Sequence, residues 1–367
     1  MESKGQQMRV LNRSLMVWIV MGLVVSSVSS SPVAAAALKL ATLVPEGSIW
    51  DKGLREMGAQ WKRKTQGRVS LRIYAGGVAG SESDILRKMR IGQLHAAALT
   101  TTGLEEIDPA FAVLSMPLFY DSFEEFLYVL DGLSPQLEAK LEAKGYVLLH
   151  WGHGGWVRFF SRAPVHGIED LRKQKIYVTA GADEMVSMWR KNGFRPVPLA
   201  QTDIMTGFQT GMIDVLATTP LAALSLQWFR QASFMHETGL APLSGATIIK
   251  LRDWNKITEA DQKLLLADAS ALEERQRTEI PAQDLIAIEE MSKRGLTVTP
   301  ADPSAEWHST ARRIAESMRG KLVPAEFYDA AKALRDEYRS RIESSAEARE
   351  SAESDAIAIA EPGGVSR

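Results

Sequence analysis

The segment His153-Gly154-Gly155-Trp156 is the strongest sign of catalysis in this chain of 367 residues. A His-Gly-Gly run forms the oxyanion loop of esterases that have the α/β-hydrolase fold. Those enzymes also carry their nucleophile in a Gly-x-Ser-x-Gly turn between a strand and a helix, and no serine of this chain stands in that frame. An esterase is therefore a remote alternative, and the glycines are better explained as a bend in the backbone.

A metal site at His150 and His153 is equally weakly supported. In an extended segment an odd separation places two side chains on opposite faces, so both could bind one ion only at an irregular turn. The remaining histidines are scattered along the chain. The chain contains no cysteine, which excludes disulfides and thiolate metal sites. We expect neither a metal ion nor a cofactor.

Polar and aromatic residues at predicted strand ends suggest binding rather than catalysis. Three short apolar runs, each followed by a turn and a helix-like segment, lie at residues 156–160, 175–179 and 213–218. Such alternation predicts a parallel sheet, and ligands bind where the strands of such a sheet end. The side chains expected to line a ligand pocket there are Trp156, Tyr177, Thr218 and Thr219.

The first part of the chain predicts further strands and helices that would position such a pocket. Residues 38–44 and 95–101 have the pattern of buried strands, and the second run ends in Thr100 and Thr101. Trp50 stands at the start of the helix that follows the first strand, and such helix starts face the ligand crevice. We therefore expect Trp50 and these two threonines to contribute to the site.

The amino terminus indicates the compartment. Lys4, Arg9 and Arg13 precede an apolar run at residues 15–25, and small residues follow at 32–37. This is the layout of a cleavable secretory signal, with an uncleaved anchor as the alternative. The apolar run is too short for a comfortable membrane span. The net charge of −2 and a charged fraction of 24% are typical of a soluble globular protein and do not suggest a nucleic-acid partner.

The ordered series DLRKQKIYVT, at residues 170–179, and GFRPVPLAQTDIMTGFQTGMIDVLATTP, at residues 193–220, carries a family resemblance. It resembles the second lobe of the periplasmic solute-binding proteins of TRAP transporters, the DctP type, and the likeness spans roughly residues 38–343. The resemblance implies an α/β, two-lobe periplasmic-binding-protein fold with hinge-crossing strands and long C-terminal helices. The expected division is a signal peptide at 1–37, lobe I at 38–155 and 246–282, lobe II and the C-terminal helices at 156–245 and 283–345, and a disordered tail at 346–367, whose composition is rich in Ser, Ala and Glu.

Three positions depart from the family pattern. By the resemblance, Tyr177 replaces an Arg that anchors a substrate carboxylate, Trp156 replaces a second Arg, and Thr219 replaces an Asn. A tyrosine cannot offer the planar fork of donors that fits a carboxylate, and a carboxylate buried without a partner is costly. We therefore expect a neutral or hydrophobic ligand. The alternative is a carboxylate held by a relocated Arg, for which Arg158, Arg162 and Arg195 are candidates and Arg158 is the first, because it shares a strand face with Trp156.

These observations predict a periplasmic solute-binding protein, not an enzyme, that captures a small molecule for the membrane permease subunits of a TRAP transporter. The sequence is compatible with the family branch that works with a tetratricopeptide-repeat partner and handles hydrophobic ligands. A periplasmic esterase and a ligand-free structural scaffold are the rival classes. The expected ligand-binding residues are Trp50, Thr100, Thr101, Trp156, Arg158, Tyr177, Gln201 and Thr219.

Overall fold

The computed structural model describes residues 36–300 and 305–360, so the predicted signal peptide lies almost entirely outside the described residues. Strands and helices alternate along most of the chain, as the sequence predicted. The strands are β1 (Ala36–Thr42), β2 (Val69–Tyr74), β3 (Ala96–Thr100), β4 (Tyr146–Ser161), β5 (Lys175–Thr179), β6 (Arg195–Leu199), β7 (Val215–Thr218), β8 (Phe234–His236), β9 (Ala241–Lys250) and β10 (Thr297–Thr299).

The helices differ widely in length. They are α2 (Ile49–Lys64), α3 (Glu82–Arg90), α4 (Thr101–Glu105), α5 (Phe123–Ala143), α6 (Ile168–Lys173), α7 (Asp183–Lys191), α8 (Ile204–Gln209), α9 (Pro220–Ser225), α10 (Leu251–Trp254), α11 (Glu259–Ser292), α12 (Ala305–Met318) and α13 (Ala325–Ala360). Short 3-10 helices lie at η1 (Pro109–Ser115), η2 (Gln201–Asp203) and η3 (Trp228–Arg230).

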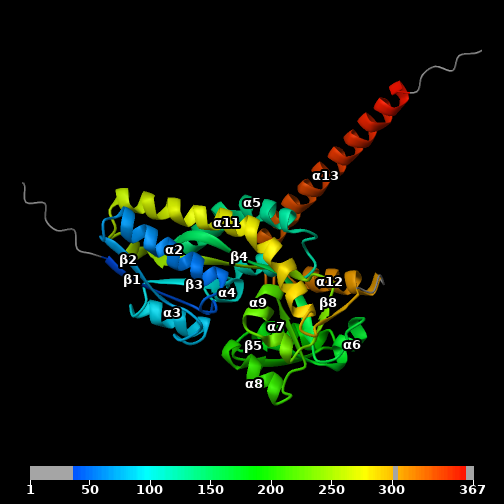
Figure 1. Ribbon diagram of the computed structural model, residues 1–367, viewed down its shortest axis with the longest axis horizontal. Coiled ribbons are helices and arrows are strands. Elements are labelled where there is room, and N and C mark those ends of the chain that lie inside the picture. The colour runs from blue at the N-terminus through cyan, green and yellow to red at the C-terminus, as the bar shows by residue number, and fades with distance from the viewer. Residues whose placement is uncertain (1–35, 301–304, 361–367) are drawn as a thin grey trace, which may run out of the picture. The chain divides into compact units, whose positions relative to one another are not determined.

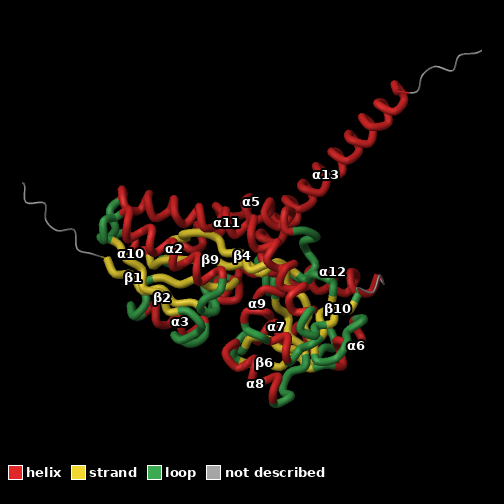
Figure 2. The backbone as a smooth tube through the Cα atoms, in the orientation of Figure 1, coloured by secondary structure: helices red, strands yellow, loops and turns green. Residues whose placement is uncertain are grey.

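The strands, which are yellow in Figure 2, form one mixed sheet. Their order is β2-β1-β3-β9-β4-β7-β5-β6, with β8 beside β4 and β10 beside β8. Strand β1 runs parallel to β2 and β3, and β5 runs parallel to β6 and β7. Strand β4 runs antiparallel to both β9 and β7. The prediction that residues 156–160 belong to a parallel arrangement is therefore wrong, because this run is the end of the long strand β4 and keeps that strand's direction.

Strand β4 connects the two groups of strands. It pairs with β9 from Tyr146 to Val157 and with β7 from Arg158 to Ser161. The pairing with β9 shifts register between His153 and Gly155, where Gly155 has a φ of +100°. The glycines of the His-Gly-Gly segment thus form a β-bulge inside one strand, and bulges bend and twist the strand that carries them.

Alternation along the strands explains how the helices cover the first part of the sheet. Leu38 and Leu40 of β1 pack in a core with α2 and α11, which lie side by side in Figure 1. Ala41 points to the other face and belongs to a separate core with α3, α4, η1 and α5. Successive side chains of β1 therefore point to opposite faces of the sheet, and each face is covered by its own layer of helices.

The same alternation gives the second group of strands two different faces. Phe160 of β4 and Leu216 of β7 pack in one core with α8 and the end of α11. Phe159 of β4 and Val215 of β7 pack in another core with α6 and α12. In this region one face of β4 therefore packs against α8 and the end of α11, and the other packs against α6 and α12.

Two helices depart from what the sequence suggested. Helix α11 continues through Pro281, although a proline inside a helix removes a backbone hydrogen bond and usually kinks or ends the helix. Helix α13 reaches Ala360 and so covers residues 346–360 of the predicted disordered tail, whose last residues, 361–367, lie outside the described part. Alanine and glutamate are strong helix formers, and residues 346–360 contain neither glycine nor proline, which explains the continued helix.

Candidate ligand-binding site

A cavity of about 730 Å³ lies at the carboxyl ends of β3 and β5. Its volume is within the range of small-molecule sites. The walls come from residues 100–118, from the end of β4, from residues 177–194 and 240–243, and from α12. Thr100, Thr101 and Tyr177, three of the residues predicted to bind ligand, line this cavity.

The other predicted residues lie outside the cavity wall. The indole N–H of Trp50 donates to the carbonyl of His153 at 2.8 Å, and its ring packs against α9 and α11. Thr219 is the N-cap of α9, where its hydroxyl accepts from the backbone N–H of Ala222. Gln201 lies in η2, beyond the end of β6, and is partly buried.

Trp156 and Arg158 also lie outside the cavity wall: Trp156 packs against the core of the first group of strands, and Arg158 lies on the face of β4 opposite to Phe159. Val157 and Phe159, which alternate with them, line the cavity. The backbone N–H of Trp156 donates to Asp284 of α11 at 2.8 Å. The two faces of this strand therefore border two different environments.

The face of Arg158 carries a row of polar side chains across three strands. Arg158 of β4 is paired with Thr218 of β7, and the parallel register of β5 and β7 brings Thr179 level with Thr218. The hydroxyl of Tyr177 lies 3.2 Å from the hydroxyl of Thr179. We call Arg158, Thr218, Thr179 and Tyr177 the polar row. It lies at the carboxyl ends of two parallel strands, the position at which ligands bind in such sheets.

Arg158 is the only guanidinium in the polar row, and it is half-buried. Among the described residues, none forms a hydrogen bond or an ion pair with it. Burial lowers the pKa of Arg158, and the carboxylates of Asp284 and Glu237, which lie farther away than an ion pair, partly oppose this. A half-buried arginine whose guanidinium N–H groups have no partner among the described residues is suited to binding an anionic ligand.

The two other candidate arginines are placed differently. Arg162 donates to the backbone carbonyl of Phe208 at 3.0 Å. Arg195 is exposed at the first residue of β6, the end opposite to the polar row. Of the three arginines named from the sequence, Arg158 is therefore the one that the fold brings to the strand ends.

A buried acid on α3, Glu82, lies close enough to Tyr177 of the polar row for its charge to act on the pKa of that tyrosine. Glu82, at the start of α3, accepts hydrogen bonds from the backbone and the hydroxyl of Thr100 at 2.6 and 2.8 Å. Burial raises the pKa of Glu82 to about 7. Burial also raises the pKa of Tyr177 to about 12, and the charge of Glu82 adds to this rise. Tyr177 is therefore a neutral hydrogen-bonding group at ordinary pH.

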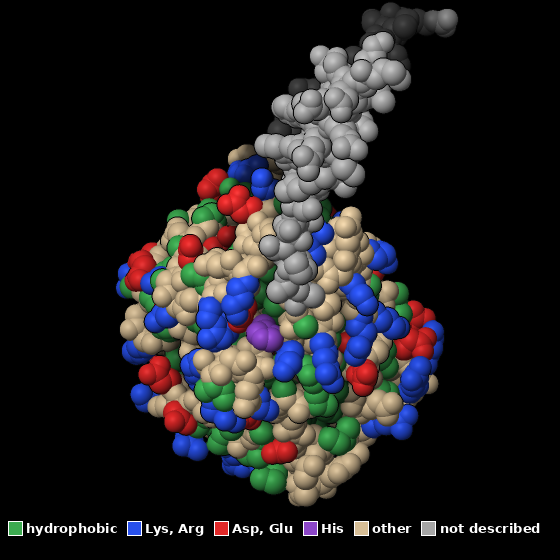
Figure 3. All heavy atoms as spheres, turned by 90° about the vertical axis from the view of Figure 1, so that its left-hand side faces the viewer, with side chains coloured by type: hydrophobic (Ala, Val, Ile, Leu, Met, Phe, Trp, Pro, Cys, Tyr) green, Lys and Arg blue, Asp and Glu red, His purple; other side chains and the backbone are tan. Residues whose placement is uncertain are grey.

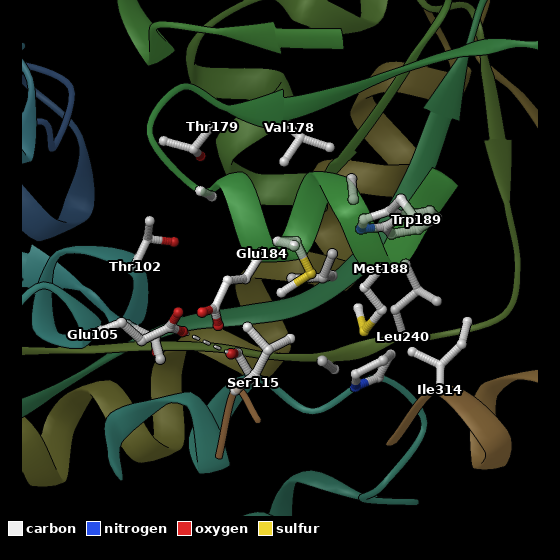
Figure 4. A pocket seen from close by; sticks show the side chains of 18 of the residues that line it. Thr102, Glu105, Ser115, Val178, Thr179, Glu184, Met188, Trp189, Leu240 and Ile314 are labelled. Atoms are coloured by element: carbon white, nitrogen blue, oxygen red, sulfur yellow. Dashed lines mark hydrogen bonds between the residues drawn. The ribbon is translucent and has the colours of Figure 1, made fainter. Parts of the chain in front are cut away.

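Several cavity residues were not predicted from the sequence. Figure 4 shows Glu105 of α4, Ser115 of η1 and Glu184 of α7 directed toward one another at one side of the cavity. The hydroxyl of Ser115 donates to Glu105 at 3.2 Å. The apolar side chains of Met188 and Trp189 lie across from this acidic side. Glu105 could have been suggested from the sequence, because it follows shortly after the end of β3. No spacing in the sequence links Glu105 to Glu184.

No cluster of histidine and acidic residues within the described part of the chain could hold a metal ion. His150 and His153 are both buried, and burial lowers the pKa of each, that of His153 to about 3. Within residues 36–300 and 305–360, no helix combines the length and the apolar character that crossing a membrane requires. On the face drawn in Figure 3, lysine and arginine side chains are interspersed with acidic and hydrophobic ones.

Comparison with protein families gives one match over most of the chain. Residues 40–321 match the family described as bacterial extracellular solute-binding protein, family 7, DctP. A solute-binding protein of Roseobacter denitrificans is 25% identical over 73% of this chain and 82% of its own length. The 2,3-diketo-L-gulonate-binding periplasmic protein of Escherichia coli is 22% identical over 74% of this chain and 83% of its own length. An uncharacterized protein of Salmonella typhimurium is 26% identical, and this chain spans half of that protein's length.

Solved structures confirm the predicted two-lobe α/β fold. A TRAP periplasmic solute-binding protein of Xanthobacter autotrophicus with bound β-D-galacturonate aligns with a TM-score of 0.75 at 20% identity, covering 82% of this chain and 99% of that one. A similar protein of Pseudomonas putida with bound D-glucuronate gives 0.74 at 23% identity, covering 81% and 96%. A Bordetella pertussis extracytoplasmic solute receptor binding pyroglutamic acid gives 0.75 at 17% identity, covering 82% and 100%.

Proposed function

Since the chain belongs to the DctP family of bacterial extracellular solute-binding proteins, we propose that it captures a small organic acid outside the cytoplasm for a TRAP permease. The acid is held by its carboxylate on Arg158 and by hydrogen bonds along the polar row. The observation that carries the proposal is the half-buried guanidinium of Arg158, which has no hydrogen-bond or ion-pair partner among the described residues and stands level with Thr218.

The ligand class follows from charge and from the relatives together. The matching structures hold galacturonate, glucuronate or pyroglutamic acid, each of which carries a carboxyl group. Those relatives favour the carboxylate alternative over a neutral or hydrophobic ligand, which was the main prediction from the sequence. Arg158 supplies the relocated cation that the alternative requires, and Tyr177 and Thr179 supply hydroxyls suited to a polyhydroxylated acid.

A neutral, largely apolar solute is the second candidate, and a specific observation favours it. The cavity that Tyr177 and Thr101 line has mostly apolar walls, and no arginine lies among the described residues of its wall. A tetratricopeptide-repeat partner belongs to this second candidate and rests on the resemblance of the sequence alone.

Isothermal titration calorimetry with D-glucuronate, D-galacturonate and D-erythronate tests the carboxylate proposal. We expect saturable binding of at least one acid, weakened about 10- to 100-fold by Arg158→Ala, because a hydrogen-bonded charge pair is lost. Arg195→Ala is the matched control, since Arg195 is exposed and lies at the opposite strand end, and it should leave binding unchanged. Absence of heat from every acid, or equal binding by both variants, would exclude the carboxylate site.

A further inference from the structure

The cavity on the other face of β4 has a chemistry that the carboxylate proposal does not use. Its deep walls are apolar and come from several elements, among them Phe159, Met188, Trp189, Leu240 and Ile314. Phe159 belongs to the core face of β4 that lies opposite to Arg158. The cavity therefore continues beyond the polar row, which it touches only at Tyr177 and Thr179.

The charged side chains at the cavity are nearly all acidic. Of the described residues that line it, the ionisable acids are Glu105, Glu106, Asp183 and Glu184, and the one base is Lys321. An organic anion would be repelled by this set, whereas a cation would be attracted. The cavity and the polar row therefore select for opposite charges.

Glu105 is the acid best placed to bind a cation. It is partly buried, and Ser115 is its hydrogen-bond partner at 3.2 Å, with Glu184 directed toward the same point in Figure 4. Burial raises the pKa of Glu105 to about 7, which means that its charged form lacks a compensating cation. A bound ammonium group would supply one.

A second unused group lines the same cavity. The side chain of Trp307 in α12 is 4% exposed, and its indole N–H has no hydrogen-bond partner among the described residues. A buried donor without a partner is unfavourable, and a ligand that brings an acceptor would satisfy it. The wall thus offers an acid, an apolar surface and one free donor.

We propose that this cavity is a second binding site, for a small apolar molecule that carries a protonated amine held by Glu105 and an acceptor within reach of Trp307. The amine lies at the acidic side, with Glu184 nearby, and the apolar body packs against Met188 and Trp189. This site does not rest on the proposed capture of an organic acid, because Glu105 and the apolar wall are separate from Arg158, although Tyr177 and Thr179 border both sites.

The test uses three probes of similar size on residues 38–367, the chain without its predicted signal peptide. They are 2-amino-1-phenylethanol, which has a ring, an amine and an acceptor; 2-phenylethylamine, which lacks the acceptor; and 3-phenylpropionate, which carries a carboxylate. Calorimetry at pH 7.5 should rank affinity in that order, with no measurable binding of the acid. Equal binding of 3-phenylpropionate and 2-phenylethylamine would overturn the proposal, and so would no binding of either amine.

Variants assign the binding to this cavity. Glu105→Gln should weaken the binding of 2-phenylethylamine about tenfold or more, since one charge-assisted hydrogen bond is lost, whereas Glu142→Gln, an exposed change on α5, should not. Met188→Trp should block the cavity, and Met212→Trp is its control because Met212 is exposed elsewhere. Thermal unfolding of each variant checks that it is folded.

The same variants separate the two proposals. Glu105→Gln and Met188→Trp should leave uronate binding intact, and Arg158→Ala should leave amine binding intact. Loss of both ligands on Met188→Trp, in a protein with unchanged thermal unfolding, would show one shared site and would overturn the second site. Binding of the amine without binding of any uronate would refute the proposed function but would support the second site.

Discussion

Asp284 on α11 connects the long helix to β4 and α9, and its removal should be among the most damaging single changes. One carboxylate oxygen accepts from the N–H of Trp156 at 2.8 Å, and the other accepts from the N–H of Leu221 at 3.0 Å. The side chain is buried, with 7% exposed. Asp284→Ala would leave both N–H groups buried without a partner, at about 1–3 kcal/mol each, or about 2–6 kcal/mol together.

The pH should change this loss in a defined direction. Burial raises the pKa of Asp284 from 3.8 to about 6, so the folded state binds the proton more tightly than the unfolded state. The contribution of this carboxyl to stability is therefore largest below about pH 4 and falls as the pH rises through 6. From this shift, Asp284→Ala should cost about 2 kcal/mol more at pH 4.5 than at pH 7.5.

Urea denaturation followed by tryptophan fluorescence at the two pH values measures both quantities. Glu289→Ala is the matched control, because Glu289 is an exposed acid on the same helix whose ion pair with Lys293 is also exposed. That control should change the free energy of unfolding by less than about 1 kcal/mol. The reasoning is refuted if Asp284→Ala costs no more than the control at pH 4.5, or if its cost grows with rising pH.

Two further predictions concern stability. His153 is buried against Phe123 and Phe126, and burial lowers its pKa to about 3, so on acidification only the unfolded state binds a proton at this side chain. Between pH 7.5 and 4.5 the free energy of unfolding of the wild type, measured by urea denaturation, should fall by about 2–3 kcal/mol more than that of His153→Phe. Equal losses in the two proteins would contradict this. A Cβ at Gly245 would lie 2.0 Å from the carbonyl oxygen of Leu99, so Gly245→Ala should lower the free energy of unfolding by about 3 kcal/mol or more. Gly152 of β4 is paired with Gly245, and a Cβ at Gly152 would lie 3.7 Å from the nearest backbone atoms, so Gly152→Ala should cost about 1 kcal/mol or less. Thermal unfolding of the two variants checks this, and similar melting temperatures would disprove the close approach of β3 and β9.

Local patterns predicted the elements well where period and capping agreed. The spacing of Ser48 to Asp51 is typical of a helix cap, and the hydroxyl of Ser48 accepts from the N–H of Asp51 at 3.3 Å at the start of α2. Strand β5 has the predicted bounds. Strand β6 was missed because Pro196 and Pro198 remove two backbone donors, which only an edge strand tolerates, and β6 lies at the edge of the sheet.

The site was less predictable, because its parts come from distant segments. Thr100, Thr101 and Tyr177 could be named, since each stands within two residues of the end of a strand, and all three line the cavity. Trp156 could not be placed, because the direction in which its side chain points depends on the bulge at Gly155. The pairing of Arg158 with Thr218 depends on the antiparallel register of β4 and β7, which no local pattern specifies.

A crystal structure of residues 38–367, the chain without its predicted signal peptide, grown with D-glucuronate tests the central claim most directly. We expect the carboxylate of the sugar acid to lie within hydrogen-bond distance of the Arg158 guanidinium, with its hydroxyl groups along Thr218, Thr179 and Tyr177. A sugar acid bound in the cavity between Glu105 and Met188, or bound with its carboxylate away from Arg158, would contradict the account.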